Sequence, residues 1–558
     1  MPPPGPRQLV TLVASVVLVL SSCVVVLGIA PATAATPSGA TGASARAGEV
    51  AGVSSQAGAG TAARAAVPAA RRPHHPTKAE RARAARLKAE RAAKKKAAKK
   101  KAAAAKKKAA AAKRAAKKKA AAERRARARL KARWARVKPG NPRTWLKTAP
   151  SRRTPWDGPR FNNPYGSTAH QRALIDKVVR AIDASPGYQT YNPITKKTMS
   201  CPTDPKYAPS VIKIAVYSIA DMRFADALVA AHRRCVSVQV LMNSHLTGKT
   251  SHSWRKIIRA LGRRGTTYRH RTSFAHRCSH GCLGTAVLHS KFFLFSHAGS
   301  ARHTVMVGST NMARNATNIQ FNDLYTVNGN ATLYAQYRHM FEAMVPDRTE
   351  PRKTPPHVFR AGPYTSTFYP FFHATERTDR TMKALRSIHC GGADGGAGIH
   401  GHTVVYIAMH SWFGDRGDYL ARRVRQMYDR GCYVRILYSF MSARIHGELT
   451  WGTGSRMVAR RVLFPGPHGV VASKYSHMKM FAASGHVGSD HSSWVVWTGS
   501  NNFSDRGLRA DDVTLRIPIK SVYDVYVHHW KYMKKRRSSS VWALFQEPSG
   551  GGRAPTGA

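Results

Sequence analysis

The sequence has 558 residues, which exceeds one compact domain, so two hydrophobic cores are the default expectation. It contains 91 Lys and Arg against 27 Asp and Glu, which gives a formal net charge of +64. This charge indicates polyanionic partners, such as nucleic acid, anionic lipid or cell-wall phosphate polymers, and it carries no information about the fold.

The first segment of the chain has the pattern of an export signal. Arg7 precedes an apolar run over residues 9–30, and Ala32-Thr33-Ala34 follows as a small-residue cleavage site. We therefore expect a signal peptide over residues 1–35 and a secreted, extracellular protein, either released or retained at the cell envelope. Because the apolar run is long, an uncleaved membrane anchor is the alternative.

Low-complexity sequence follows this segment. Residues 36–77 are rich in Ala, Gly, Ser, Thr and Pro and are predicted to be a disordered linker, as are residues 549–558 at the other end of the chain. Residues 78–140 contain almost only Ala, Lys and Arg, which form helices well but provide no apolar stripe to bind a core. This segment is either a tether for an anionic polymer or membrane surface, or a solvated stalk without a partner.

An internal repeat begins near residue 141. The elements predicted for residues 141–350 are a helix near 174–182, a strand at 211–218, a helix near 224–231, a strand at 236–242 and a helix at 253–261. The elements predicted for residues 351–548 are a helix near 382–388, a strand at 404–411, a helix near 420–428, a strand at 433–438 and a helix near 456–462. Alternating strands and helices predict two α/β lobes, each a sheet flanked by helices.

The cysteines follow the same repeat. Cys201 and Cys390 each precede the first strand of a copy, and Cys235 and Cys432 each open the strand after the following helix. Repeat equivalence therefore predicts the disulfides Cys201–Cys235 and Cys390–Cys432. If Cys23 leaves with the signal peptide, an even number of cysteines remains, as is typical of an oxidising compartment.

One further cysteine pair lies close together in the first copy. Cys278 and Cys282 are accompanied by His276 and His280. A short-loop disulfide is the expected state, and a zinc site is the alternative, although the spacing is not that of a standard zinc finger.

A motif of chemical interest also occurs once in each copy. His289-Ser290-Lys291 is followed by Gly308-Ser309-Thr310-Asn311, and His477-Met478-Lys479 by Gly499-Ser500-Asn501-Asn502. In an extended strand residues two apart share a face, so each His and its Lys are expected to point the same way. Two such faces brought together would offer imidazole, ammonium and amide groups to one phosphate.

These residues resemble the signature of the phospholipase D superfamily, a duplicated H-x-K-x4-D followed by G-S-x-N. The sequence departs from it at Ser296 and Ser484, where the family usually has Asp. The resemblance implies two phospholipase D-like lobes related by a pseudo-twofold axis, and phosphodiester chemistry without a metal or cofactor. Because both motifs lie in one chain, it also implies a monomer.

The resemblance further implies a role for each motif residue. His289 would attack phosphorus and form a phosphohistidine, while His477 would act as acid and then base. The groups expected to hold or assist the phosphoryl oxygens are Lys291, Lys479, Asn311, Asn502, Ser309 and Ser500. Asp323 and Asp512 follow the two G-S-x-N motifs and are interpreted as orienting the histidines, the alternative being ordinary strand-end carboxylates.

Three functions agree with these features. The first is hydrolysis, or transfer to another alcohol, of phospholipid head groups. Residues 368–372, Phe-Tyr-Pro-Phe-Phe, are then a candidate surface for acyl chains, although a core strand is the expected role. The second is a secreted nuclease acting on DNA or RNA, which the basic segment would suit. The third is a non-catalytic polyanion-binding protein of the cell envelope.

Overall fold

The computed structural model describes residues 77–134, 147–188, 191–192, 197–198, 201, 210–246, 251–263, 273–454, 457–461, 463–464 and 474–536. The expected signal peptide and C-terminal tail, nearly all of the expected linker, and residues 135–146 lie outside the described residues. Within the described part of the chain, no helix combines the length and the apolar character that a membrane crossing requires.

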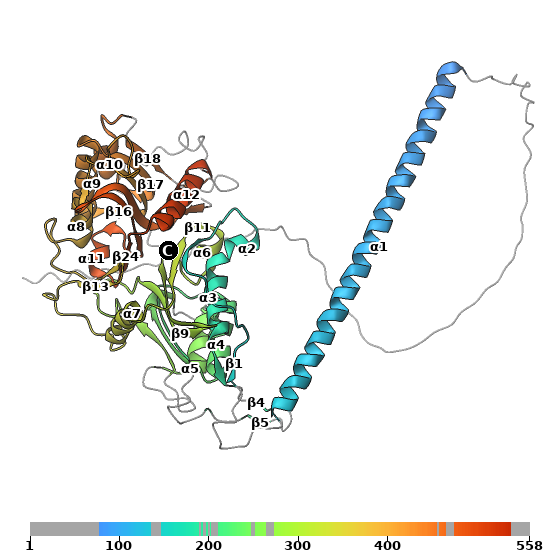
Figure 1. Ribbon diagram of the computed structural model, residues 1–558, viewed down its shortest axis with the longest axis horizontal. Coiled ribbons are helices and arrows are strands. Elements are labelled where there is room, and N and C mark those ends of the chain that lie inside the picture. Colours follow the sequence, from blue (N-terminus) through green and yellow to red (C-terminus); the bar gives the residue numbers. More distant parts are fainter. Residues whose placement is uncertain are drawn as a thin grey trace, which may run out of the picture. The chain divides into compact units, whose positions relative to one another are not determined.

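The basic segment forms one continuous helix, α1 (Lys78–Trp134), of 57 residues (Figure 1). At 1.5 Å per residue it extends over about 85 Å. All of its described side chains are exposed. Ala, Lys and Arg have high helix propensity, so local preference favours this helix. Burial of its described side chains does not contribute.

The first lobe is built on a mixed sheet with helices on both faces. Its strands, in sheet order, are β2 (Gly158–Phe161), β12 (Asp323–Val327), β10 (Ala301–Gly308), β9 (Lys291–Ala298), β6 (Val211–Val216), β7 (Ser237–Asn243) and β8 (Phe274–Cys278). Its helices are α2 (Thr168–Gln171), α3 (Ala173–Ala184), α4 (Met222–Arg233), η3 (Ser244–Leu246), α5 (His252–Leu261), α6 (Arg314–Asn318) and α7 (Ala331–Met344). Two short ladders, β1 (Lys147–Thr148) with β3 (Gly187–Tyr188) and β4 (Tyr191–Asn192) with β5 (Lys197–Thr198), accompany the sheet.

The second lobe repeats this arrangement. Its strands, in sheet order, are β13 (His357–Ala361), β14 (Tyr364–Phe368), β24 (Val513–Ile517), β22 (Asp490–Gly499), β21 (Lys479–Val487), β16 (Val404–Phe413), β17 (Tyr433–Met441) and β18 (Met457–Arg461), with β15 (Ile388–His389) beside β21 and β23 (Phe503–Ser504) beside β16. Its helices are α8 (Arg380–Arg386), α9 (Gly414–Asp429), α10 (Ala443–Thr450), α11 (Arg506–Arg509) and α12 (Lys520–Arg536). The order β12-β10-β9-β6-β7-β8 therefore corresponds strand by strand to β24-β22-β21-β16-β17-β18.

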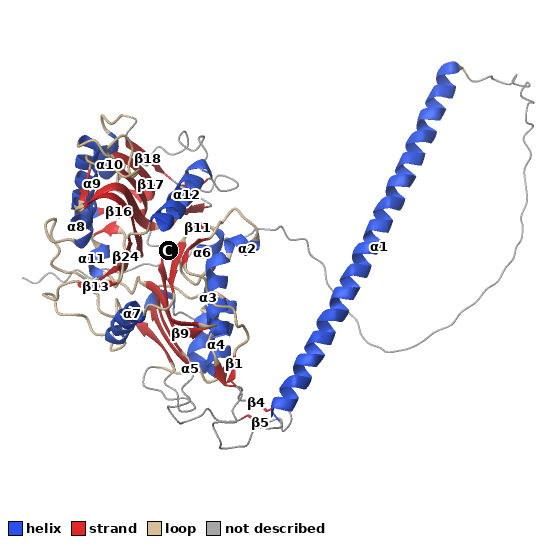
Figure 2. Ribbon diagram, viewed as in Figure 1, coloured by secondary structure: helices blue, strands red, loops and turns tan. Residues whose placement is uncertain are grey.

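Burial explains how the two lobes are held together. One face of the first sheet is covered by α3, α4 and α5, and the corresponding face of the second by α8, α9 and α10. The opposite faces of both sheets share one core with α7 and α12 (Figure 2). Because apolar area removed from water stabilises by about 25 cal/mol per Å², this shared core is the main force joining the lobes. The prediction of α/β lobes with sheets flanked by helices is confirmed.

One expected element was wrong. Residues near 456–462 were predicted to be helical, but Met457–Arg461 is the edge strand β18, paired in parallel with β17. The helix at this point of the repeat is α10, which ends at Thr450 before Gly452 adopts a positive φ of 60°. The open edge of β17 provides hydrogen-bond partners that outweigh the helix propensity of this short run.

The described cysteines form three disulfides. They are Cys201–Cys235, Cys278–Cys282 and Cys390–Cys432. The first and third close equivalent loops of the two lobes, and the second closes a short turn next to the interface between them.

Candidate active site

The two motifs meet because each lobe contributes backbone to the other. Strand β11 (Gln320–Phe321) of the first lobe pairs in parallel with β20 (Lys474–Ser476), which also pairs with β19 (Leu463–Phe464). In the reciprocal position, Leu288 forms a parallel bridge with Asp511. Each H-x-K therefore lies beside the segment that follows the other lobe's G-S-x-N.

The first histidine is fixed by the second lobe at both its backbone and its ring. The His289 amide donates to the Asp511 carbonyl at 3.0 Å. Its Nδ1 donates to Asp512 Oδ1 at 2.9 Å, so the lone pair of Nε2 is free. Burial, together with the nearby Lys291 charge, lowers the pKa of His289 to about 4, although Asp512 opposes the shift. The imidazole is therefore neutral at pH 7.

The second histidine has a symmetrical backbone contact but a different ring partner. The His477 amide donates to the Phe321 carbonyl at 2.9 Å. Its Nδ1 lies 3.1 Å from the Ser309 carbonyl and 2.9 Å from Asn322 Oδ1, both of which are acceptors. Asn322 Nδ2 donates to the Ala316 carbonyl at 3.2 Å, which fixes the orientation of the amide. Burial lowers the pKa of His477 well below its usual value.

Strand register identifies Asn322 as the counterpart of Asp512. Gly308 pairs with Leu324 in one lobe, and Gly499 pairs with Thr514 in the other. Counting back by two residues from these partners gives Asn322 and Asp512. The site therefore orients one histidine with a carboxylate and the other with a neutral amide.

Asp323, expected to orient a histidine, has a different role. Its carboxylate is fully buried and accepts hydrogen bonds from the hydroxyls of Ser309 at 2.6 Å, Thr498 at 2.5 Å and Tyr526 at 2.8 Å. Since Thr498 and Tyr526 belong to the second lobe, Asp323 joins the lobes behind the site. The expectation failed because the residue aligned with Asp512 is Asn322, and the carboxylate of the first copy stands one residue further along the chain at Asp323.

The two lysines lie beside the histidines, and Lys291 Nζ lies 5.3 Å from the centre of the Tyr217 ring, which also meets His289. Strands β9 and β21 begin at Lys291 and Lys479, so each His lies just before the strand. Lys291 Nζ donates to the His289 carbonyl at 2.5 Å, and Lys479 Nζ to the His477 carbonyl at 2.7 Å. Both lysines are buried. Burial lowers the pKa of Lys291 to about 7 and that of Lys479 well below its usual value.

The G-S-x-N residues close the back of the site. Ser500 donates to Asp512 Oδ1 at 2.5 Å, so the same carboxylate oxygen accepts from Ser500 and His289. Burial alone would raise the pKa of Asp512, but His289, Lys291 and Ser500 hold it below its usual range. The amide oxygens of Asn311 and Asn502 are buried without a hydrogen-bond partner among the described residues, as expected for groups positioned to meet a ligand.

A cavity of about 560 Å³ unites the site. Of the six residues expected to be catalytic, His289, His477 and Asn502 line it. The lining side chains that sequence reasoning missed include Tyr217, His245, His410, Phe413, Phe440, Arg506 and Arg509. None of residues 368–372 lines this cavity, and Phe368 and Tyr369 are buried in the sheet region, so they form no acyl-chain surface beside the histidines.

Two of the missed residues accompany the histidines symmetrically. The Tyr217 ring meets His289 edge-on at 5.4 Å, and the His410 ring meets His477 edge-on at 4.6 Å between centroids. They occupy matching positions, Tyr217 directly after β6 and His410 within β16, which the repeat alone could have indicated. His410 Nδ1 donates to the Ser476 carbonyl at 3.1 Å, and burial lowers the pKa of His410 well below its usual value.

A buried ion pair holds the second G-S-x-N loop. Arg416 Nε donates to Asp379 at 2.8 Å, and both side chains are fully buried. Arg416 Nη1 donates to Asn501 Oδ1 at 2.9 Å and to the Asn502 carbonyl at 2.8 Å. Removing one partner of such a pair typically costs 3–5 kcal/mol. The pair therefore fixes the loop on which Asn502 is carried.

Ser296 and Ser484, which stand where the family usually has Asp, form hydrogen bonds with backbone amides. Ser296 Oγ accepts from the Val211 amide at 2.8 Å, and Ser484 Oγ accepts from the Gly398 amide at 3.0 Å. Both lie well along their strands from the histidines, and neither lines the cavity. Their hydroxyls tie neighbouring strands and loops to the sheets.

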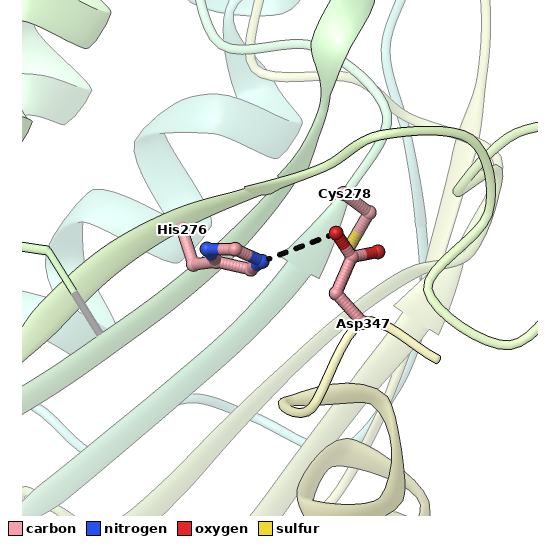
Figure 3. A group of neighbouring side chains, drawn as sticks. All are labelled: His276, Cys278 and Asp347. Atoms are coloured by element: carbon pink, nitrogen blue, oxygen red, sulfur yellow. Dashed lines mark ion pairs between the residues drawn. The ribbon is translucent and has the colours of Figure 1, made fainter. Parts of the chain in front are cut away.

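The cysteine–histidine cluster is organised around its disulfide. His276, Cys278 and Asp347 lie together, with His276 Nε2 at 3.5 Å from Asp347 (Figure 3). The Cys278 sulfur is bonded to Cys282, so it is no thiolate ligand for a metal. The turn closed by this disulfide directs the Cys282, Leu283 and Gly284 amides at the Asp511 carboxylate, at 2.5, 3.0 and 2.6 Å. It therefore supports the residue next to Asp512.

A family model matches part of the first lobe. Residues 206–345 match the family model described as "Cardiolipin synthase, PLD-like domain". No curated protein sequence matches the chain significantly.

Solved structures similar to the chain come from several proteins. Polyphosphate kinase of Porphyromonas gingivalis is 11% identical over 70% of this chain, with a TM-score of 0.42, and the match spans 54% of that protein. Phosphatidylserine synthase of Haemophilus influenzae is 12% identical over 70% of this chain and 88% of that one, also at 0.42. Nuc of Salmonella typhimurium, a phospholipase D family member, is 16% identical over 34% of this chain and 96% of its own, with a TM-score of 0.23.

Asp512 orients one histidine and Asn322 orients the other. Replacing the carboxylate by an amide, or the amide by a carboxylate, is therefore predicted to affect kcat unequally. Asp512→Asn removes the charge that stabilises positive charge on His289, so kcat on a soluble phosphodiester is expected to fall by about 10²–10⁴. Because Asp512 opposes the lowering of the His289 pKa, its loss should also move the acid limb of the kcat/KM profile below pH 4. The measurement is the pH profile with bis(p-nitrophenyl) phosphate.

Asn322→Asp is the matched variant. A carboxylate at this position should raise the pKa of His477 and move the corresponding limb to higher pH, with kcat retained within about tenfold. Equal losses in both variants, or an unchanged kcat in Asp512→Asn, would contradict the assignment.

Proposed function

Because the chain belongs to the phospholipase D superfamily, we propose that it is a phosphodiesterase that acts through a phosphohistidine. The observation that carries this proposal is that His289 and His477, from different lobes, line one cavity with Nδ1 of each bound to an acceptor. Each ring thus has its Nε2 lone pair available for reaction. This activity requires no metal or cofactor.

The proposed reaction proceeds in two displacements. His289 Nε2 attacks phosphorus, the bond to the leaving alcohol breaks, and protonated His477 gives its proton to the leaving oxygen. Neutral His477 then accepts a proton from water, whose oxygen attacks phosphorus and breaks the P–N bond. A carboxylate on His289 suits this division, because the phosphorylated ring carries positive charge that Asp512 stabilises.

The buried cations explain how substrate binding prepares the site. Burial, and then the charges of Lys479 and Lys291, lower the pKa of His477, and a phosphodiester anion in the cavity opposes this effect. Substrate therefore favours the protonated His477 that the first step needs. Asn311 and Asn502 each carry an Nδ2 group, which is the donor suited to bind a phosphoryl oxygen, whereas their unpaired Oδ1 atoms are acceptors.

We propose a phospholipid as the substrate, with either water or another alcohol as acceptor of the phosphatidyl group. Tyr217, Phe413 and Phe440 give the cavity aromatic walls, and Arg506 and Arg509 add positive charge. Such walls accept the glycerol and the start of the acyl chains, while the arginines attract the phosphate. The disulfides support secretion into an oxidising compartment.

A nuclease is the second candidate, favoured by one observation. The net charge is +64, and α1 exposes Lys and Arg along its described length. Nucleic acid binds such a surface by releasing counterions. A non-catalytic polyanion-binding protein agrees less well, because it has no use for the oriented histidines.

The substrate test compares two substrates that both contain a phosphodiester bond, phosphatidylcholine and DNA. Wild-type protein should release head groups from phosphatidylcholine liposomes and leave DNA intact over the same time, and His289→Ala should lose the activity by at least about 10³. The readouts are choline release and gel electrophoresis. Cleavage of DNA with intact liposomes would instead support the nuclease.

Trapping the covalent intermediate distinguishes the roles of the two histidines. With bis(p-nitrophenyl) phosphate the leaving group needs no proton, so His477→Ala should release about one equivalent of p-nitrophenolate and then stop. The adduct should be found on His289 by mass spectrometry after digestion at neutral pH. His289→Ala should show no burst, whereas an adduct on His477 would reverse the roles.

The basic helix is proposed to deliver the enzyme to an anionic polymer or membrane surface. Deletion of residues 78–134 should leave turnover of the soluble diester unchanged and weaken binding to DNA and to anionic vesicles. The salt slope of binding should also fall, since fewer counterions are released. A loss of soluble-substrate turnover would show that the helix takes part in catalysis.

A further inference from the structure

The second lobe contains another cavity, on the face of its sheet that points away from the first lobe. Its volume is about 630 Å³, within the range of small-molecule sites. It lies between α8 and the strands β13, β14 and β24, and it shares no lining residue with the catalytic cavity. The catalytic site described above therefore does not use this second cavity.

A row of paired residues crosses the floor of this cavity. Phe481 pairs with Trp497 and Trp497 with Arg516. The row continues through Thr365, which pairs with Arg516, to Arg360. Since neighbouring strands lie about 4.8 Å apart, the row runs for about 19 Å from an aromatic end to a cationic end.

The first lobe has no such opening at the equivalent positions. Phe293 and Met306 correspond to Phe481 and Trp497 and are fully buried in the core beneath α3. Helix α3 has 12 residues, whereas α8 in the second lobe has 7. The shorter helix leaves the outer sheet face between itself and β24 uncovered, so the cavity is specific to the second lobe.

The charges around this cavity have one sign. Arg360, Arg380, Lys383 and Arg516 line it, and no acidic residue does. Within the described residues, none of these four side chains forms an ion pair. Burial, with the neighbouring charge of Arg360, lowers the pKa of Arg516. The charge of Asp490 opposes this shift without forming an ion pair with Arg516. Four cations that form no ion pair among the described residues, at a pocket with aromatic and hydroxyl side chains in its lining, create a site that an anion would stabilise.

We propose that this cavity binds an anionic lipid, with its phosphate against Arg360 and Arg516 and an acyl chain along Phe481, Trp497 and Val487. The positive charges favour an anionic ligand. The aromatic end of the floor favours a ligand in which an apolar group is attached to the anion. A nucleotide fits less well, because Trp497 is only 5% exposed and lies between Phe481 and Arg516, so its ring offers no open face for a base.

The site is independent of the catalytic proposal. If one lipid molecule of an anionic surface enters this cavity, it attaches the second lobe to that surface. It does not contact His289 or His477. The product expected from phospholipid hydrolysis, a phosphatidate, has the same chemistry. The cavity could therefore retain the enzyme on a surface that its own reaction has made anionic.

The test measures binding of dihexanoyl phosphatidate, below its micelle concentration, by titration calorimetry. All proteins carry His289→Ala, so that nothing is hydrolysed. Arg360→Gln with Arg516→Gln should weaken binding at least tenfold. Arg302→Gln with Arg352→Gln, which removes the same charge from exposed positions outside the cavity, should not change it. Inorganic phosphate and dihexanoyl phosphatidylcholine should bind at least tenfold more weakly than phosphatidate.

Several outcomes would overturn the proposal. They are equal affinities of the two double variants, equal binding of phosphatidate and phosphatidylcholine, or tighter binding of a hexanucleotide that depends on Arg360 and Arg516. In the protein with His289 intact, Arg360→Gln with Arg516→Gln should leave turnover of bis(p-nitrophenyl) phosphate unchanged. A loss there would show that the arginines act on the catalytic cavity and not on a separate site.

Discussion

The site depends on a reciprocal exchange of hydrogen bonds between the lobes. Each motif histidine donates its backbone amide to the opposite lobe, and each ring takes its orienting partner from there, Asp512 for His289 and Asn322 for His477. Neither lobe alone can therefore fix its own histidine. The shared core of α7, α12 and the two inner sheet faces supplies the apolar burial that holds this exchange in register.

The active site contains two buried lysine side chains next to the histidines. Lys291 and Lys479 are buried, and burial lowers the pKa of both. Buried charge is costly unless it is paired, and each ammonium has a backbone carbonyl as its hydrogen-bond acceptor. An incoming phosphate raises the pKa of both lysines and of His477, so binding and activation follow from the same electrostatic effect.

The sequence predicted the parts of this site that recur. The two motifs, the strand order and the cysteine pairs repeat in the chain, and periodicity is sufficient to find them. It did not predict Asn322, because the search was for a carboxylate and the nearest one in the first copy is Asp323; strand pairing is needed to align Asn322 with Asp512. It placed each Lys on a strand together with its His, whereas β9 and β21 begin at Lys291 and Lys479, so each His lies just before its strand. Register and strand ends are decided by tertiary pairing, not by local pattern.

Duplication within one chain allows the halves to differ, and the differences have physical consequences. Two identical subunits would present identical orienting groups, so both imidazoles would have the same basicity. Here a carboxylate supports one ring and an amide the other, which favours positive charge on His289 and leaves His477 free to exchange a proton. The same freedom shortened the outer helix of the second lobe and uncovered the cavity beside Trp497. The chain therefore keeps the symmetry where the motifs must meet and loses it where the two halves have separate tasks.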